Sequence, residues 1–347
     1  MDADMIGFDI AKSVFQAHGE SADRQIALKK RLPRGQVVNY FAKLPPALIG
    51  IEACGSSHYW ARTLRALGHD VRLIPAAYVT PFVKRNKNDA HDAAAICAAL
   101  GRPDMRFVAI KSEAQQASRG LERARDLLVK QHTQLTNCIR SLMAEFGIIA
   151  AQGRRGFAEL AGLVEQGDAR IPEVLCTALQ ALLKQAQNLS EAMTALEKQI
   201  MAIAQSDPVM RRLATIPGIG GLTAHAIVVA VGDGKQFASA RDFAAWCGLT
   251  PKEASSGNKK RTLGLSRAGD MRLRKLFALG ASTIMRNARS STERATIWQR
   301  GILARRPMKV AVLAQAAKAA RIAWALLVSG ETFQPQRATS RAFATAQ

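Results

Sequence analysis

Two short apolar segments, each carrying a carboxylate at its end, constrain the fold of this chain more than any other feature. Met5–Ile10 and Ala47–Ile51 have the length and composition of buried strands, and they bring Asp9 and Glu52 to strand ends. A buried carboxylate without a partner is strongly disfavoured by desolvation. Because ligand sites in α/β sheets gather at such strand ends, we expect both acids to serve one site.

The rest of the first 110 residues alternates between strand and helix patterns. The sequence predicts further strands at Ser13–His18, Gln25–Leu32 and Asp70–Ile74, and helices at Gly35–Leu44 and His58–Leu67. Three antiparallel strands followed by alternating helices and strands is the pattern of the ribonuclease H and RuvC-like nuclease fold. We therefore expect an α/β domain with a mixed sheet over residues 1–110.

A second pair of acids opens an Ala-rich run that reaches Leu100. Asp89 and Asp92 follow Lys87-Asn88 and lie three residues apart, so a helix places them on one face. Carboxylates at this spacing repel each other, and a divalent metal is the usual solution. The alternative is a capping arrangement in the first helical turn.

Taken together, Asp9, Glu52, Asp89 and Asp92 come from three segments that this fold would bring to one point. Two Mg²⁺ ions held by such a set stabilise the attacking and leaving oxygens of a phosphoryl transfer, and Mn²⁺ is a possible substitute. The alternative is that Asp9 and Glu52 only cap turns. The set predicts a metal-dependent enzyme acting on phosphodiesters.

The middle of the chain reads as long amphipathic helices. Apolar residues recur at helical spacing over residues 112–147 and 172–205, and a glycine-broken segment between them predicts a turn or short helical hairpin. An antiparallel coiled coil over residues 111–205 would separate two domains and could join protomers into a dimer or tetramer. No chemistry is assigned to it.

Residues 206–330 predict a mainly helical domain. Ile216-Pro-Gly-Ile-Gly220 and the apolar run after it have the signature of a helix-hairpin-helix, in which Gly218 and Gly220 let backbone N–H groups approach a DNA phosphate. The alternative is that this hairpin only packs helices. Three helices are expected beyond it, at Arg272–Met285, Thr292–Leu303 and Met308–Val328, and a disordered tail at 331–347.

The charge predicts a polyanionic partner. The chain carries a net charge of +22, and residues 251–347 hold 19 basic and 4 acidic residues. No uninterrupted apolar stretch reaches the ~18 residues of a spanning helix, so we expect no membrane partner. The cations expected to contact a nucleic-acid backbone are Lys259, Lys260, Arg261, Arg267, Arg272, Arg274, Lys275, Arg305, Arg306 and Lys309.

The five cysteines are scattered and form no C-x-x-C pair. They predict buried, reduced thiols and a cytoplasmic protein, without a zinc site or disulfides.

The segments Gly248–Gly257 and Asn258–Gly269 resemble the carboxyl-terminal transposase domain of the 110/1111 family of bacterial insertion sequences, whose relatives include the Piv invertases. The amino-terminal acids match the Asp-Glu-Asp-Asp quartet of that family at Gly7-Phe8-Asp9, Ile51-Glu52-Ala53 and Asp89-x-x-Asp92. The resemblance covers nearly the whole chain in the right order.

This resemblance implies a transposase or recombinase that cuts and rejoins DNA, in the bacterial cytoplasm at the nucleoid. Its nucleophile would be the serine that precedes the glycine, Ser256, with Ser255 as the adjacent possibility. Its partners would be double-stranded DNA, at the element ends and the target, and a non-coding bridge RNA. Two other classes stay open: a structure-selective nuclease that needs the acids and not Ser256, and an inert nucleic-acid-binding remnant that needs neither.

Overall fold

The computed structural model describes residues 3–83, 89–255, 261–266, 269–291, 293 and 295–335. It divides into two compact units, Met1–Gln116 and Ala117–Gln347. The predicted coiled-coil segment thus shares a unit with the C-terminal helices. Several predicted features lie outside the described residues: Lys87, Asn88, Ser256, Lys259, Lys260, Arg267 and most of the predicted tail.

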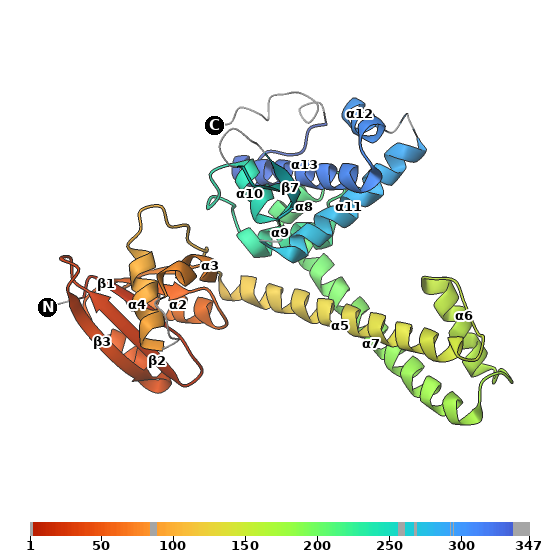
Figure 1. Ribbon diagram of the computed structural model, residues 1–347, viewed down its shortest axis with the longest axis horizontal. Coiled ribbons are helices and arrows are strands. Elements are labelled where there is room, and N and C mark those ends of the chain that lie inside the picture. Colours follow the sequence, from red (N-terminus) through yellow and green to blue (C-terminus); the bar gives the residue numbers. More distant parts are fainter. Residues whose placement is uncertain are drawn as a thin grey trace. The chain divides into compact units, whose positions relative to one another are not determined.

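The first unit is built on a five-stranded mixed sheet (Figure 1). Its strand order is β3-β2-β1-β4-β5, in which β1, β2 and β3 are antiparallel and β4 and β5 run parallel to β1. This confirms the predicted succession of three antiparallel strands and two crossovers, and it fits the expected RuvC-like α/β domain. The strands are β1 Met5–Asp9, β2 Val14–Glu20, β3 Ile26–Pro33, β4 Leu48–Glu52 and β5 Asp70–Ile74.

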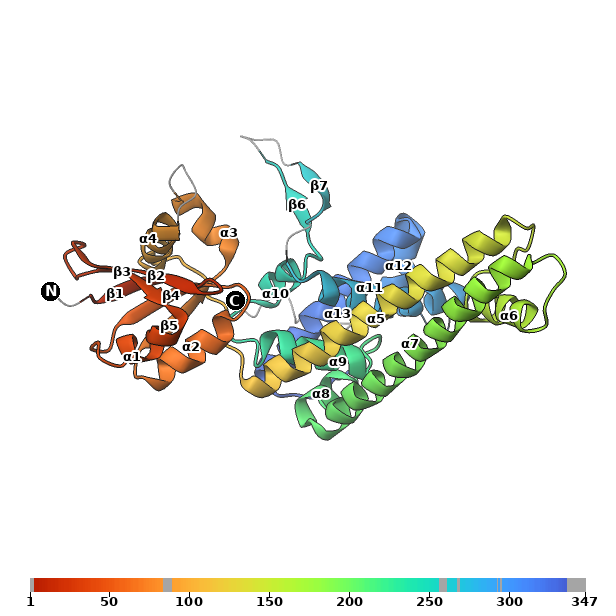
Figure 2. The same ribbon diagram turned by 90° about the horizontal axis from the view of Figure 1, so that it is seen from below.

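Helices cover both faces of this sheet (Figure 2). On one face Ile6, Phe8 and Phe15 are fully buried in a core that includes residues of α1 (Val37–Phe41) and α2 (Ser57–Ala66). The helix predicted at Gly35–Leu44 is shorter than expected and follows a 3₁₀ turn, Arg34–Gln36. On the other face lies α4 (Asp89–Leu100), reached from β5 through the short helix α3 (Ala76–Val79) and a 3₁₀ turn, Thr80–Phe82.

Two glycines allow α4 to lie directly on the sheet. A Cβ atom built on Gly7 would stand 2.1 Å from the carbonyl oxygen of Ala93 and 2.4 Å from the backbone nitrogen of Cys97. A Cβ atom on Gly50 of the neighbouring strand would stand 3.1 Å from a methyl group of Leu100. Because no larger residue fits at Gly7 without moving the helix backbone, this glycine fixes the height of α4 above the strand that ends in Asp9.

The second unit contains the two predicted long helices, α5 (Glu113–Ala144, which begins at the unit boundary) and α7 (Glu173–Ser206), with α6 (Arg154–Glu165) between them. An ion pair joins α5 to α7, with Arg125 Nη2 2.8 Å from Glu197 Oε2. At the far end of the pair, α6 closes a small core of buried residues from all three helices, Ile139, Met143, Ile148, Leu160, Val164, Ile171 and Leu179. The segment between the long helices, predicted as a turn or short helical hairpin, holds the single helix α6 among its described residues.

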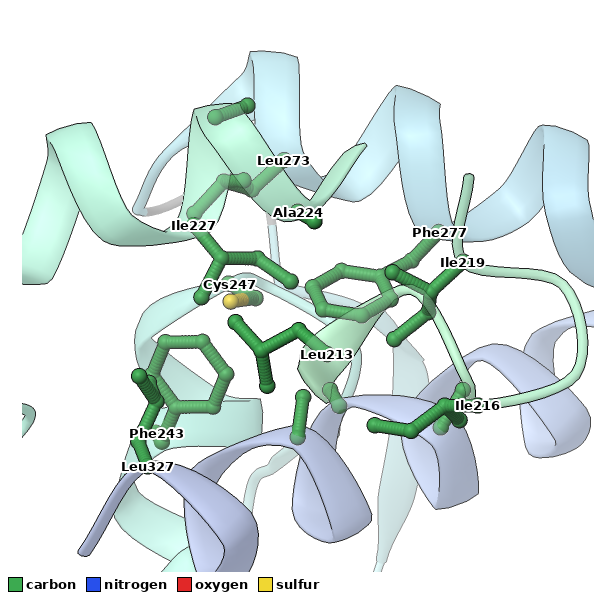
Figure 3. Packing of buried hydrophobic residues seen from close by; sticks show 14 of the residues in the cluster. Leu213, Ile216, Ile219, Ala224, Ile227, Phe243, Cys247, Leu273, Phe277 and Leu327 are labelled. Carbon is green, nitrogen blue, oxygen red and sulfur yellow. The ribbon is translucent and has the colours of Figure 1, made fainter. Parts of the chain in front are cut away.

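The remaining helices surround a separate apolar core (Figure 3). Leu213, Ile227, Phe243, Phe277 and Leu327 meet there from five different helices. These five helices are α8 Pro208–Leu213, α9 Gly221–Val231, α10 Ala240–Trp246, α11 Met271–Ser290 and α13 Met308–Ser329. A further helix, α12 Ile297–Arg305, contributes none of the described residues of this core. The three helices predicted after residue 270 are therefore confirmed, with α12 starting later than expected, behind a capping box formed by Thr296 and Gln299.

Helix α13 is the described element that bears on the expectation of no membrane partner. Among the described residues, it is long and apolar enough to cross a membrane by length and composition alone. Ala316, Ala320 and Ala323 are nevertheless fully buried in the core of the unit, and Lys309, Lys318 and Arg321 interrupt its apolar sequence. We interpret α13 as a core helix.

Candidate active site

Asp9 and Glu52 lie side by side at one edge of the sheet. Strands β1 and β4 are parallel neighbours whose register pairs Phe8 with Ile51, so the next residue of each strand is an acid. Both carboxyl-bearing residues are half-buried, at the point where the chain leaves the sheet. The carboxyl edge of the parallel strands thus presents two acids together, as predicted.

Asp92 joins them from α4, where it is also half-buried. Burial raises the pKa of Glu52 above its ordinary value, and the negative charge of Asp92 raises it further. The pKa of the Cys54 thiol is likewise raised by burial and then by Glu52 and Asp9. The charges that raise the pKa of Glu52 and of Cys54 therefore lie near one another. They belong to Asp9, Glu52 and Asp92, which come from separate segments. Cys54 is exposed, contrary to the expectation of buried thiols, and so is Cys138.

Asp89 is the first residue of α4, one helical turn before Asp92, and the position of its side chain lies outside the description. Within the described part of the chain, no three His, Cys, Asp or Glu side chains are close enough to hold a metal ion. The donors nevertheless fit one, because they are hard carboxylate oxygens, and the charge of Asp92 adds to the effect of burial in raising the pKa of Glu52. A divalent cation would offset that charge, so the chemistry of the set suits Mg²⁺ or Mn²⁺.

The segment around the predicted nucleophile has more structure than the sequence suggested. Strands β6 (Pro251–Glu253) and β7 (Thr262–Leu265) form an antiparallel hairpin that extends from the helical core (Figure 2). The backbone N–H of Ala254 donates to the carbonyl of Arg261 at 2.9 Å, which closes the ladder. Ser255 and Arg261 are exposed. Residues 256–260, which include Ser256, connect these two ends and lie outside the description.

The base of this hairpin is held rigidly on α10. Gly269 has φ +90°, and a Cβ atom there would stand 1.7 Å from the carbonyl oxygen of Trp246. The next residue, Asp270, donates its backbone N–H to the same carbonyl at 3.1 Å, and its side chain accepts from two backbone N–H groups of α11. Only glycine fits at position 269, so the hairpin leaves the core at a fixed point.

The segment predicted as a helix-hairpin-helix lies between two helices, α8 and α9. Gly218 has φ +83° and packs against α11, since a Cβ atom on it would stand 3.2 Å from the carbonyl of Gly280. Gly220, at the N-cap of α9, is exposed. The contact of Gly218 is the helix-packing alternative that sequence analysis left open, and only Gly220 has a free surface.

The predicted cations separate into two groups. Lys275, Arg305, Arg306, Lys309 and Arg261 are exposed. Arg274 is half-buried, with Nε donating to the carbonyl of Cys247 at 3.4 Å. Arg272 does not fit the expectation of a phosphate contact, because its side chain is 12% exposed and its Nε lies 2.7 Å from Asp126. We therefore omit Arg272 from the surface proposed below.

Two segments of the chain match known families. Residues 6–148 match the family DEDD_Tnp_IS110, described as a transposase, and residues 210–296 match the Transposase IS116/IS110/IS902 family. A probable family 20 transposase of Pseudomonas aeruginosa is 43% identical over 339 residues, covering 96% of this chain and 100% of that protein. The chain belongs to the IS116/IS110/IS902 transposase family.

Two further relatives agree with this assignment. The transposase for insertion sequence element IS1111A of Coxiella burnetii is 37% identical and covers 96% of this chain and 92% of its own. The pilin gene-inverting protein of Moraxella bovis is 37% identical over 90 residues, 24% of this chain and 28% of that protein. The predicted resemblance is confirmed, and the protein is a transposase, an enzyme that acts on DNA.

Sequence analysis missed a buried ion-pair network in the second unit of the transposase. Glu122 of α5 is fully buried, and its carboxylate lies 2.8 Å from Nδ1 of His225 on α9 and 2.9 Å from Nη1 of Arg119. Arg272 of α11 pairs with the same carboxylate. Arg119 Nη2 also lies 3.2 Å from Asp270 Oδ2, at the base of the β6–β7 hairpin. The network fixes α9, α11 and the hairpin base to α5.

Replacing Glu122 with glutamine tests the importance of this network. Burial alone would raise the pKa of Glu122, but the hydrogen bond with His225 and the charge of Arg272 outweigh it and lower that pKa. A carboxyl group whose pKa is lower in the folded than in the unfolded state stabilises the fold at pH values above its unfolded-state pKa. This stabilisation is lost as the pH falls through the folded-state pKa. We expect Glu122→Gln to lower the free energy of unfolding at neutral pH by about 3 kcal/mol, because it removes the buried charge with which Arg119 and Arg272 both pair.

The measurement is urea unfolding over a series of pH values from neutral to acidic, with exposed Glu159→Gln as the control. Wild type should lose stability on acidification more steeply than Glu122→Gln. Equal unfolding free energies for the two variants at neutral pH would show that the network is not stabilising.

Proposed function

We propose that this transposase cuts and rejoins DNA through Ser256 as the nucleophile, with divalent metal ions held by Asp9, Glu52, Asp89 and Asp92. The observation that carries the proposal is the adjacency of Asp9 and Glu52 at the ends of paired parallel strands, with Asp92 near enough for its charge to add to the effect of burial in raising the pKa of Glu52. Mg²⁺ bound there would stabilise charge on the phosphate and on the departing oxygen.

The proposed reaction conserves the energy of the broken strand. The Ser256 hydroxyl oxygen attacks phosphorus and gives up its proton, the bond from phosphorus to the leaving sugar oxygen breaks, and a phosphoserine linkage and a free sugar hydroxyl result. A sugar hydroxyl of the recipient strand then attacks the phosphoserine and releases the serine. No histidine or acid lies next to Ser256 in sequence, so activation of its hydroxyl is assigned to the acidic set.

The proposed partners follow from charge and from the family. The exposed cations Lys275, Arg305, Arg306, Lys309 and Arg261 would contact duplex phosphates, together with the N–H groups near Gly220 and the cations Lys259, Lys260, Arg267 and half-buried Arg274. A bridge RNA from the element would supply the sequence recognition. Because the acids and the serine belong to different units, we expect the acids of one protomer to serve the serine of another in a dimer or tetramer.

Metal removal tests the proposed chemistry as a whole. Purified protein, the element RNA and element-end DNA should exchange strands with Mg²⁺, lose exchange to background with a chelator, and regain it with Mg²⁺ or Mn²⁺. Exchange that persists after exhaustive chelation would contradict a catalytic role for the acidic set.

A further inference from the structure

A basic groove of about 720 Å³ lies on the sheet face of the first unit that α4 covers in part. One wall is formed by β2 and β3, through Gln16, His18, Lys29 and Arg31, and the other by alanines of α4 such as Ala94 and Ala98. The small alanine side chains leave the space open. The groove is distinct from the described carboxylates of the acidic set, since Asp9, Glu52 and Asp92 are not among its lining residues.

The charge of this groove is positive and incompletely balanced. Its single acid, Glu20, lies 3.4 Å from Arg24 and 3.7 Å from His18. Among the described residues, Lys29 and Arg31 form no ion pair, and both are exposed. Burial lowers the pKa of His18 in spite of Glu20, so this histidine adds no charge at neutral pH. Lys30 also lines the groove and is exposed, so three cations without an ion pair among the described residues line it, which favours a polyanionic occupant.

The strand register connects the groove to the acids. Asp9 of β1 pairs with Gln16 of β2, and Gln16 pairs in turn with Arg31 of β3. Paired residues of adjacent strands project on the same face of a sheet. Since neighbouring strands lie about 4.8 Å apart, the Cα atoms of Asp9 and Arg31 are about 10 Å apart, a distance that an arginine and one or two nucleotides can span.

We propose that this groove holds the sugar-phosphate backbone of the DNA strand that is presented to Asp9, with Lys29 and Arg31 as its phosphate contacts. The inference rests on the proposed function, since it takes the acids as the place of strand cleavage. DNA is the occupant because the strand register places the groove residues Gln16 and Arg31 beside Asp9, and the strand that is cut must pass there. Lysines on the edge strand β3 could otherwise serve only to prevent edge-to-edge pairing, and the experiment separates the two roles.

The test is a lysine-acetylation footprint of the full-length protein, read residue by residue by mass spectrometry. It is carried out in the Asp9→Asn background so that no strand is turned over. A single-stranded DNA oligonucleotide of element-end sequence should reduce acetylation of Lys29 several-fold, while exposed Lys43, which does not line the groove, keeps its reactivity. Protection by an RNA oligonucleotide of the same sequence and not by DNA would overturn the proposal.

Binding of the same DNA provides a second measurement. Lys29→Ala/Arg31→Ala should make the log-log salt slope of binding shallower by about 1.4, at 0.7 for each cation on single-stranded DNA. The matched control Lys43→Ala/Arg106→Ala removes two exposed cations that do not line the groove. An equal change of slope in the two double variants, or an unprotected Lys29, would leave only the edge-blocking role. Neither result depends on whether Asp9 is catalytic, which the exchange assay of Asp9→Asn decides separately.

Discussion

Asp9→Asn, Glu52→Gln, Asp89→Asn and Asp92→Asn should each reduce DNA strand cleavage and exchange by about 10³-fold or more. A metal ion supplies several kcal/mol of transition-state stabilisation, and each 1.36 kcal/mol corresponds to tenfold in rate. The variants keep the size of the side chain and remove its charge, so metal affinity falls while the fold is retained. Removal of Asp92 should also return the pKa of Glu52 toward its ordinary value, because the charge of Asp92 raises it.

Binding of DNA and RNA should survive these substitutions. The matched control is Asp23→Asn, an exposed acid in the turn between β2 and β3, which should keep full activity. Strand exchange at the wild-type rate by any one of the four variants would remove that residue from the catalytic set. Loss of binding together with activity would point to a structural role.

Ser256→Ala should abolish strand exchange to a similar extent, for a different reason. The substitution removes the proposed nucleophilic oxygen and leaves the acids and the cationic surface intact, so DNA binding, RNA binding and oligomerisation should be unchanged. Ser255→Ala is the matched control, since it removes a hydroxyl from the adjacent exposed position, and it should have a mild effect. Full exchange by Ser256→Ala would exclude this serine as the nucleophile.

The sequence was sufficient to predict the first unit because its signals are local. The apolar runs that end at Asp9 and Glu52 define two strands, and the alternation of strand and helix patterns defines their connection. Parallel pairing then places the two acids together without further information. The position of Asp92 beside them depends on Gly7, whose missing side chain lets α4 approach β1. A single glycine in a strand pattern does not predict which helix will pack against it.

The features that sequence reasoning missed depend on contacts between distant segments. Arg272 resembled other cations of a basic helix, but its partner Glu122 comes from α5, far earlier in the chain. Gly218 fitted a phosphate-binding turn, yet its contact is with Gly280 of α11. The β6–β7 hairpin was not predicted because its strands have only three and four residues, and β6 is mostly polar. In each case tertiary packing selected between local interpretations that the residues alone left open.

The central claim is that a serine of the β6–β7 segment attacks DNA with the help of metal-bound acids. Denaturing electrophoresis of a reaction with end-labelled element DNA and Mg²⁺ tests it most directly. We expect the label to migrate with the wild-type and Ser255→Ala proteins as a covalent adduct, and to be absent from protein in Ser256→Ala, Asp9→Asn and chelator-treated samples. Cleaved DNA with free ends in the Ser256→Ala reaction, and no labelled protein with wild type, would mean that water is the nucleophile and that the enzyme is a metal-dependent nuclease.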